Sequence, residues 1–551
     1  MEFQGCIWYV FIGTTVQTMA NPAFSFPMTT DIYLDSNATN PVLAAAVDAA
    51  RQAMEQDFGN PSSTHQAGLR AKAVLEAVRT KAARVLDAGD GRLMFNSGAT
   101  EGIHTAVLSA LVALRERRAR GERIGRWLLC GATEHKAVPE SLAHWNRLLG
   151  LNLEILELPV DGDGRHDLSR LHSVAPECAL VCTMAANNET GVISDLAGIE
   201  AVLAATDSPA YWLVDGVQAL GKLPLKLAGT RIDYAPFSGH KLYAPKGIGM
   251  LYVRAGAPFT PLMVGGGQEA GWRSGTENMA GIAAFGAVLD ELEDGRTLRD
   301  PKQLKALRDQ LAGALRAAFP GLQFNTPFDK ALPTTLNFSV PGRASAELLK
   351  LFDDAGIHVS AGSACSSGQT TSSHVLQAMQ LPRWRSASAV RMSFGPLTDA
   401  ATIAAACDAI ARCGAALAAQ PLVADHAIAG TAALDAFLRS HPEALLVDVR
   451  EAHEHAAGGG VQIGGRSALN VPMSRLSAHA TVWLRANGQP PLVFICRSGQ
   501  RARQAAASMR DRGHEHAWYL AGGLAEAAAA PTLADVPGNE SRARVAQRKT
   551  A

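Results

Sequence analysis

Lys241 closes the segment FSGHK, which follows a predicted strand. A lysine whose amine is neutral can attack an aldehyde and form a Schiff base. Ser238 and His240, in the same segment, can donate hydrogen bonds to phosphate oxygens. Asp215 ends an earlier predicted strand, where a carboxylate can keep a pyridine nitrogen protonated and make the ring an electron sink. Together these side chains predict a site for pyridoxal 5′-phosphate (PLP).

The segment SGAT, residues 97–100, directly precedes a predicted helix. Glycine lets the backbone approach a ligand, and amides at a helix N-terminus hold anions. We therefore expect Ala99 and Thr100 to contribute to a phosphate cradle. A plain helix N-cap is the alternative explanation.

Two cysteines lie in segments suited to sulfur chemistry. Cys365 lies in SAGSACSSGQTTSS, whose Gly and Ser content predicts a mobile loop that could carry a thiol into a substrate and out again. An ordinary PLP transaminase needs no such residue. Cys496 begins CRSGQR, a loop between a strand-like and a helical segment, which can aim backbone amides at the sulfur.

Chain length and apolar periodicity predict three folded parts. Helical stretches alternate with short β-rich runs from about residue 40 to 285, which predicts an α/β domain with a mostly parallel sheet. Longer helices and fewer strands predict a small α+β domain at about 286–418. A linker at 419–425 precedes a small α/β domain at 426–532. An N-terminal extension at 1–28 and a tail at 533–551 are predicted to be disordered.

The composition argues against several classes of protein. Lys plus Arg equals Asp plus Glu, at 51 each, so no global field would attract nucleic acid or an anionic membrane. No run approaches the roughly 20 apolar residues that a membrane span needs. A secretory signal begins with a positively charged region, but no Lys or Arg precedes Arg51. The spacing of the eight cysteines suggests neither a metal site nor a disulfide framework, so we expect a cytoplasmic protein. Cys178 and Cys182 are expected to pack in the core on one face of a strand.

Nine motifs of the chain resemble, in order and spacing, those of the cysteine desulfurases of iron-sulfur cluster assembly and tRNA thiolation. They are YLDSNATN (33–40), GNPSSTHQAG (59–68), FNSGATE (95–101), TEHKAV (133–138), NNETGV (187–192), VDGVQALGKLP (214–224), FSGHKLYAPKGIGMLYVR (237–254), RSGTEN (273–278) and SAGSACSSG (360–368). The resemblance covers residues 29–418. It implies PLP-dependent transferase fold type I, with an aspartate-aminotransferase-like large domain and a small α+β domain.

The resemblance also implies a role for each matched residue. Lys241 would be the Schiff-base lysine, Asp215 the partner of the pyridine nitrogen, and His135 the ring that stacks on the cofactor. Gln218 and Asn188 would contact the hydroxyl side of the ring, while Asn37 and Arg391 would grip the substrate carboxylate, with Asn188 beside them. The phosphate would be held by Thr100, Ser238 and His240, and by Thr276 of a neighbouring subunit, which implies a homodimer.

By the same resemblance, the reaction converts L-cysteine to L-alanine and leaves the sulfur on Cys365 as a persulfide. His135 could serve as the base that deprotonates this thiol. The long Ser-rich stretch resembles the subgroup that hands sulfur directly to acceptor proteins. The chain departs from the pattern at Gly102-Ile103-His104 and at the Thr-Thr-Ser-Ser run of the cysteine loop, which could alter substrate fit or partner choice.

The C-terminal domain resembles a single rhodanese domain, on the motifs VDVREAHE (447–454), ALNVPMSRL (468–476), CRSGQR (496–501) and YLAGGL (519–524). Gln462 stands where a histidine is common, and the aromatic residue that often closes the last motif is absent. We expect a relay from Cys365 to Cys496 and on to an acceptor, although an inert docking module is an alternative. A selenocysteine lyase, a non-catalytic sulfur-carrier scaffold and a plain aminotransferase also remain open.

Overall fold

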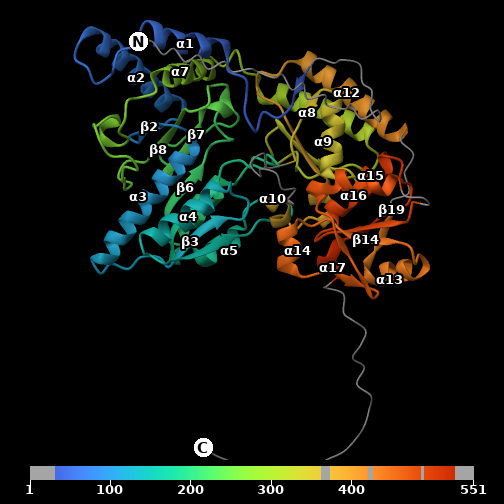
Figure 1. The fold of residues 1–551 in the computed structure, drawn as a ribbon. Coiled ribbons are helices and arrows are strands. Elements are labelled where there is room, and N and C mark those ends of the chain that lie inside the picture. Colours follow the sequence, from blue (N-terminus) through green and yellow to red (C-terminus); the bar gives the residue numbers. More distant parts are fainter. Residues whose placement is uncertain (1–30, 362–372, 420–425, 486–488, 528–551) are drawn as a thin grey trace, which may run out of the picture. The chain divides into compact units, whose positions relative to one another are not determined.

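The structure is a computed structural model that describes residues 31–361, 373–419, 426–485 and 489–527. The chain divides into two compact units, Met1–Ala419 and Gln420–Ala551 (Figure 1). The predicted extension at 1–28, the predicted tail at 533–551 and residues 420–425 of the predicted linker lie outside the described residues.

The first unit contains a seven-stranded sheet in the order β2-β8-β7-β6-β5-β3-β4. Only β8 runs antiparallel to its neighbours, so the prediction of a mostly parallel sheet is confirmed. The interior strand β5 is buried along its whole length, as expected for a strand covered on both faces. The strands are β2 (Arg92–Asn96), β3 (Trp127–Gly131), β4 (Glu154–Leu158), β5 (Cys178–Met184), β6 (Tyr211–Asp215), β7 (Tyr234–Ser238) and β8 (Gly249–Val253).

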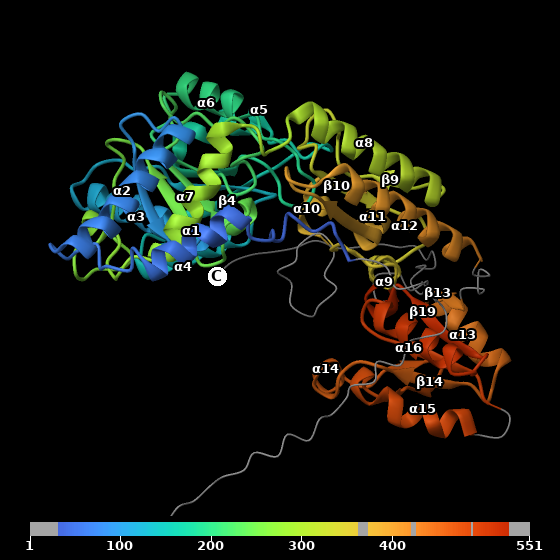
Figure 2. The ribbon, with the colours of Figure 1, turned by 90° about the horizontal axis from the view of Figure 1, so that it is seen from above.

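Helices cover both faces of this sheet (Figures 1 and 2). In α2, Ala71, Leu75, Val78 and Ala82 form the buried stripe that an amphipathic helix requires. One face carries α1 (Ala44–Glu55), α2 (Gln66–Val85), α5 (Leu168–Val174), α6 (Leu196–Ala205) and α7 (Met279–Asp294), and the other α3 (Ala99–Ala119) and α4 (Ala137–Leu148). Helix α7 packs in the core of the large domain, so the predicted boundary near residue 285 falls inside it.

The expectation that Cys178 and Cys182 share one face of a strand is wrong. Both side chains are buried, but Cys178 belongs to the core on one face of the sheet and Cys182 to the core on the other. The pairing of β3 with β5 shifts by one residue between Trp127 and Leu128, which face Cys178 and Leu180. This extra residue is a β-bulge, and it reverses the side-chain alternation that the spacing predicted.

The small domain packs helices on a three-stranded antiparallel sheet, β12-β10-β9, and on a two-stranded parallel sheet, β1-β11. Helix α8 begins with a capping box formed by Asp300 and Gln303, and with Pro301 at its first position. The strands are β1 (Ile32–Tyr33), β9 (Gln323–Phe324), β10 (Thr335–Ser339), β11 (Ile357–His358) and β12 (Ala389–Ser393). The helices are α8 (Pro301–Ala318), α9 (Ser345–Asp354), α10 (His374–Ala378), α11 (Arg383–Ser388) and α12 (Ala400–Ala419).

Helix α12 is long and apolar enough over Ala400–Ala418 to cross a membrane by length and composition, a stretch that the sequence analysis did not single out. It packs beside α8, and Ile403, Ile410 and Cys413 lie in the core of the small domain. The apolar face of α12 is therefore explained by packing inside the fold.

The second unit has a five-stranded parallel sheet in the order β13-β19-β18-β14-β17, with core clusters on both faces. Its strands are β13 (Ala427–Ala429), β14 (Leu445–Asp448), β17 (Leu469–Asn470), β18 (Leu492–Ile495) and β19 (Ala517–Ala521), beside a short hairpin of β15 (Gln462–Ile463) and β16 (Arg466–Ser467). Its helices are α13 (Gly430–Ser440), α14 (Ala452–Gly458), α15 (Leu476–Arg485), α16 (Gln500–Asp511) and α17 (Gly523–Ala527). The prediction of a C-terminal α/β domain is confirmed.

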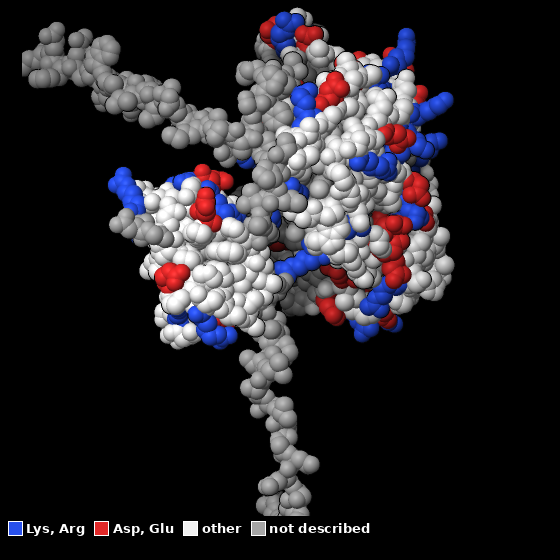
Figure 3. Space-filling view, turned by 90° about the vertical axis from the view of Figure 1, so that its right-hand side faces the viewer, with Lys and Arg blue, Asp and Glu red and all other residues white. Residues whose placement is uncertain are grey.

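Acidic and basic side chains are interspersed over the face drawn in Figure 3. They do not gather by sign on that face, in keeping with the equal numbers of acidic and basic residues in the chain.

Candidate active site

A cavity of about 460 Å³ lies at the carboxyl ends of several strands of the large sheet. This edge is where parallel α/β sheets bind ligands. Most residues that the sequence analysis assigned to cofactor and substrate come together here. Those that line the cavity are Asn37, Ala99, Thr100, His135, Asn188, Asp215, Gln218, Ser238, His240, Lys241 and Arg391.

Lys241 lies in the single turn of 3-10 helix, Gly239–Leu242, that follows β7. Its Nζ donates to the backbone oxygens of Asn37 and Ala38, at 2.6 and 2.7 Å. These contacts hold the amine at the cavity wall and tie the segment between β1 and α1 to the large sheet.

Asp215 ends β6 and is buried. Burial raises its pKa to about 6, although the Val217 amide, which donates to Oδ1 at 2.9 Å, and the nearby Lys241 act against the rise. A protonated pyridine nitrogen beside this carboxylate would supply the positive partner that the burial lacks. The carboxylate therefore fits the predicted role opposite the ring nitrogen.

The N-terminus of α3 faces the cavity through Ser97, Gly98, Ala99 and Thr100. Gly98 has a φ of 149°, which side chains rarely adopt, so the turn into the helix favours glycine. Ser238 and His240 line the same cavity. Burial, helped by Lys241 and Lys246, lowers the pKa of His240 to about 4, which keeps the ring neutral at physiological pH. This cradle fits a phosphate group.

Asn37, which lines the same cavity, is the centre of a hydrogen-bond network. Its side chain donates to the Asn188 backbone oxygen at 3.2 Å, and its backbone oxygen accepts from Gln218 Nε2 at 3.0 Å. Lys222 Nζ donates to Gln218 Oε1 at 2.6 Å and to Asn37 Oδ1 at 3.3 Å. Sequence reasoning missed Lys222, although it lies four residues after Gln218 in the quoted motif VDGVQALGKLP.

Arg391, in β12, is almost fully buried, and its guanidinium makes two hydrogen bonds within the protein. Nη2 donates to Asp35 Oδ1 at 2.6 Å and Nη1 to the Asn188 backbone oxygen at 3.0 Å. Nε has no hydrogen-bond partner among the described residues. These two contacts fix the orientation of the guanidinium and leave further N–H groups that can donate to a substrate carboxylate.

Two further groups that the sequence analysis did not assign, Glu189 and His374, line the cavity. Glu189 is fully buried, and Oε2 accepts from the Ser373 hydroxyl at 2.6 Å. Glu189 lies in the quoted motif NNETGV, but nothing in the sequence predicted its contact with Ser373, which is far away along the chain. Cys365 lies outside the described residues.

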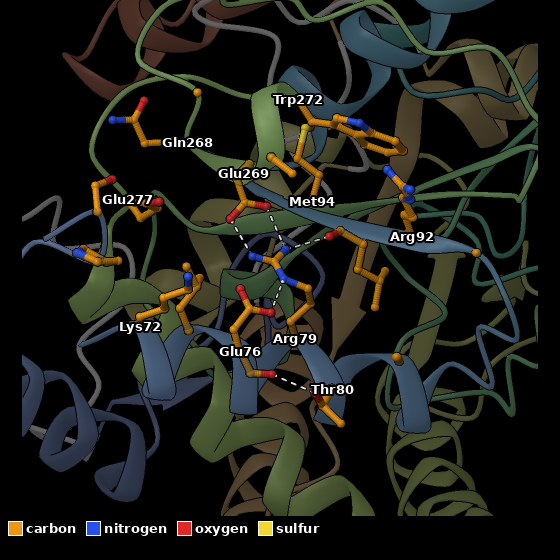
Figure 4. A pocket seen from close by; sticks show the side chains of 18 residues that line it. Lys72, Glu76, Arg79, Thr80, Arg92, Met94, Gln268, Glu269, Trp272 and Glu277 are labelled. Atoms are coloured by element: carbon orange, nitrogen blue, oxygen red, sulfur yellow. Dashed lines mark hydrogen bonds and ion pairs between the residues drawn. The ribbon is translucent and has the colours of Figure 1, made fainter. Parts of the chain in front are cut away.

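Thr276 does not line the cavity: it is exposed in the loop that precedes α7. This loop is anchored beside a larger hollow of about 770 Å³ between α2 and the start of β2 (Figure 4). There the Glu269 carboxylate accepts from Arg79 Nη1 and Nη2 at 2.8 and 2.9 Å. A second anchor joins Arg273 Nε to Glu101 Oε1 at 3.0 Å, at the first turn of α3.

In the second unit, Cys496 directly follows β18 and is buried. The Ala502 amide, in the first turns of α16, donates to Sγ at 3.4 Å. Gly499 has a φ of 81°, so the loop turns through the left-handed region. The backbone amides of Leu524 and Ala525 donate to the backbone oxygens of Cys496 and Arg497, at 3.0 and 2.9 Å. These two hydrogen bonds fix the start of the loop.

Charged side chains surround this loop. Arg501, the last residue of the motif CRSGQR and the second residue of α16, makes two hydrogen bonds to Glu454, at 2.5 and 2.8 Å. Asp448, at the end of β14, accepts from Arg450 Nη2 at 2.7 Å and from His455 Nδ1 at 2.8 Å. Burial alone would raise the pKa of Asp448, but these hydrogen bonds outweigh it and hold the pKa below its usual value. These ion pairs hold the Arg501 and Arg450 guanidiniums in fixed orientations.

Within the described ranges, no group of three or more His, Cys, Asp or Glu side chains could hold a metal ion. In the first unit, a lysine amine, a buried carboxylate and a helix N-terminus meet in one cavity of the large sheet. This combination defines a PLP-dependent enzyme of fold type I.

Comparison with known proteins is consistent with this class. Residues 32–405 match the class-V aminotransferase family, and residues 432–530 match the rhodanese-like domain. A cysteine desulfurase of Cereibacter sphaeroides is 37% identical over 375 residues, 68% of this chain and 92% of its own. Cysteine desulfurase 2 of Trichormus variabilis is 39% identical over 373 residues, covering 68% and 90%. The solved structure of a NifS-like protein aligns with a TM-score of 0.62 at 30% identity, over 71% of this chain and all of its own.

The chain therefore belongs to the class-V aminotransferases and, within them, to the PLP-dependent cysteine desulfurases. It carries a rhodanese domain at its C-terminus. The predicted family, fold class and cofactor are confirmed.

Proposed function

We propose that this enzyme removes sulfur from L-cysteine, holds it as a persulfide on Cys365, and passes it through Cys496 to an acceptor protein. The observation that carries the proposal is the presence of two sites suited to sulfur chemistry on one chain. One is the cavity around Lys241, and the other is the loop that closes over Cys496. Tethering raises the effective concentration of the second thiol near the first.

PLP, when bound, supplies an electron sink for the substrate carbon. Lys241 would bind PLP through its amine. Once the substrate has displaced this amine from PLP, the amine would take the proton from the substrate Cα. Asp215 would keep the ring nitrogen protonated, and the α3 N-terminus with Thr100, Ser238 and His240 would hold the phosphate. Arg391 and Asn37 would orient the substrate carboxylate, because the Asp35 and Asn188 contacts already fix the guanidinium.

The proposal includes a homodimer in which Thr276 reaches the phosphate site of the partner. The exposure of Thr276 and the two anchors of its loop support this, since the residue does not line the cavity around Lys241 in its own subunit. Exposed apolar side chains on the same domain also support it, with Phe58 68% and Val264 82% exposed. Sedimentation of the full chain tests this part, and a monomer at micromolar concentration would contradict it.

The activity is tested with purified holoenzyme, L-cysteine and a thiol reductant. Alanine and sulfide should form, and both Lys241→Ala and Cys365→Ala should abolish alanine formation. Alanine formation that does not depend on Cys365 would overturn the mechanism. A much higher rate with selenocysteine would identify a selenocysteine lyase instead.

The relay needs its own test, because desulfuration can occur without it. Cys496→Ser should leave the single-turnover yield of alanine unchanged and remove the persulfide from the C-terminal domain, as measured by mass spectrometry of proteolytic fragments. Unchanged rates and identities of all persulfide acceptors in this variant would refute the relay.

A further inference from the structure

Lys222 has no role in the proposed function, yet it contacts two residues of the main cavity. It lies four residues after Gln218, in the segment that follows β6. Its Nζ donates to Gln218 Oε1 at 2.6 Å and to Asn37 Oδ1 at 3.3 Å, and both of these residues line the cavity. An ammonium group only donates hydrogen bonds. Lys222 therefore acts on the cavity through two side-chain amides.

The orientation of the Gln218 amide is fixed at both of its ends. Oε1 accepts from Lys222 Nζ, and Nε2 donates to the backbone oxygen of Asn37 at 3.0 Å. If the amide were reversed, its oxygen would meet the Asn37 oxygen and its N–H groups would meet the ammonium group. Neither pair can form a hydrogen bond, so the amide has one favourable orientation.

In this orientation, Nε2 of Gln218 lies beside the amine that would bind PLP. The Asn37 backbone oxygen accepts from Gln218 Nε2 at 3.0 Å and from Lys241 Nζ at 2.6 Å, so the two nitrogens are neighbours around one acceptor. An amide nitrogen carries two hydrogens, and the Asn37 oxygen takes one of them. The second hydrogen can be donated to a ligand that is bound to Lys241 in the cavity.

Lys222 also fixes the side chain of Asn37. Nδ2 of Asn37 donates to the Asn188 backbone oxygen at 3.2 Å and to the Thr335 hydroxyl at 2.9 Å. Both hydrogens of Nδ2 are thus in use, and Oδ1 accepts from Lys222. One amine therefore ties the segment between β1 and α1 to the segment after β6, where Gln218 lies.

The charge of Lys222 costs free energy at this place. Burial, helped by the positive charges of Lys241 and Arg391, lowers its pKa to about 7. Among the residues that the structure describes, no carboxylate forms an ion pair with Nζ. An apolar side chain of similar length would avoid this cost. The hydrogen bonds to the two amides are what a lysine provides here.

We propose that Lys222 is a positioning residue, which holds the Gln218 amide so that Nε2 donates to the ring oxygen of PLP. This rests on the proposed function in one respect, that PLP lies in this cavity with its hydroxyl side beside Gln218. The positive charge on the far side of the amide strengthens Nε2 as a donor, because hydrogen bonds in a chain polarise one another. Without Lys222 the amide loses its single orientation, and Nε2 is no longer held toward the ring.

The test compares PLP binding to the apoproteins of the wild type and Lys222→Met, because methionine has a similar length and cannot donate a hydrogen bond. The dissociation constant of PLP should rise about tenfold in the variant, as expected for the loss of a hydrogen bond from a charged group. The visible absorbance of the bound cofactor should also shift, because the ring oxygen loses its donor. Lys226→Met, at an exposed lysine further along the chain, is the matched control and should bind PLP as the wild type does.

A double-mutant cycle separates positioning through Gln218 from a general structural role. In a Gln218→Leu background, Lys222→Met should leave the dissociation constant and the absorbance of PLP unchanged. A lysine that only supports the fold would weaken PLP binding equally in both backgrounds. If Lys222→Met does not fold, Lys222→Leu takes its place in the cycle.

Equal PLP affinity in Lys222→Met and the wild type, or equal losses in the two backgrounds, would overturn the inference. If the wild type forms alanine from L-cysteine and Lys222→Met binds PLP as tightly as the wild type, the proposed function stands and this inference fails. If the wild type binds PLP but forms no alanine, the proposed function fails, while the PLP affinities still decide the role of Lys222.

Discussion

Nη2 of Arg391 lies 2.6 Å from Oδ1 of Asp35, and their side chains are 2% and 16% exposed. Removing one partner of a buried ion pair leaves the other charge uncompensated. Asp35→Ala should therefore lower the free energy of unfolding by about 3 kcal/mol, measured by urea titration of the apoprotein. Asp48→Ala removes an ion pair whose partners are 69% and 65% exposed, and should cost less than about 1 kcal/mol. If both variants lose the same free energy of unfolding, the buried ion pair stabilises the fold no more than an exposed one.

Asp215 makes the stability of the apoprotein depend on pH. Its pKa is raised from 3.8 to about 6 in the folded state, so the folded protein binds the proton more tightly than the unfolded chain. The resulting cost is absent below pH 3.8, grows between pH 3.8 and 6, and is complete above pH 6. Asp215→Asn should then stabilise the apoprotein at pH 8 by on the order of 3 kcal/mol and have little effect at pH 4.

Thermal unfolding of both apoproteins across this pH range measures the effect. In the presence of PLP the order should reverse, because the variant lacks the partner of the ring nitrogen. A variant that is less stable than the wild type at pH 8 without PLP would contradict the explanation.

Glu269 and Ala270 have φ values of 50° and 55°, in the left-handed region that disfavours side chains. The buried Glu269 carboxylate holds this turn through Arg79 and through the Phe95 amide at 3.1 Å. Glu269→Ala should lower the free energy of unfolding by about 2 kcal/mol and weaken the association of the proposed dimer, measured by denaturation and sedimentation. Glu76→Ala also removes a partner of Arg79, but Glu76 is 54% exposed, so this control should behave as the wild type.

A side chain at Gly523 would collide with the loop that holds Cys496. An added Cβ would lie 2.4 Å from the Gly499 amide nitrogen and 2.5 Å from the Cys496 oxygen. Gly523→Ala should displace the loop and abolish the proposed transfer of sulfur to Cys496, measured by mass spectrometry, while alanine formation continues. Gly430 also has a positive φ, at 80°, but has open space around it, so Gly430→Ala reports backbone strain alone. Equal effects of the two substitutions would rule out the collision.

The fold could be predicted to a large extent because its signals are local. Short apolar runs such as the one at 178–184 became buried strands of a mostly parallel sheet, and the motifs around Lys241 and Asp215 gave the family and the cofactor. The cavity then brought together residues whose only sequence signal was the motif in which each stands.

What could not be predicted depends on contacts between distant segments or on single-residue irregularities. The bulge that separates Cys178 from Cys182 has no signature in the apolar pattern. A hydrogen bond to Asn37 positions Lys222, and a hydrogen bond to the Glu134 backbone oxygen positions His374. Both partners lie far away in the sequence. The type of a residue does not predict a hydrogen-bond partner that only the tertiary fold brings near it.

Strand β1 has a consequence for the biosynthesis of the enzyme. Ile32 pairs with Ile357, and Asp35 bridges to Ser393, so the segment that also carries Asn37 cannot take its place until the ribosome has made those later residues. Asn37 in turn holds the Lys241 amine through its backbone oxygen. The large sheet can therefore form on the nascent chain while its cofactor pocket still lacks a wall, and the apoenzyme becomes ready to receive PLP only after translation has passed β12.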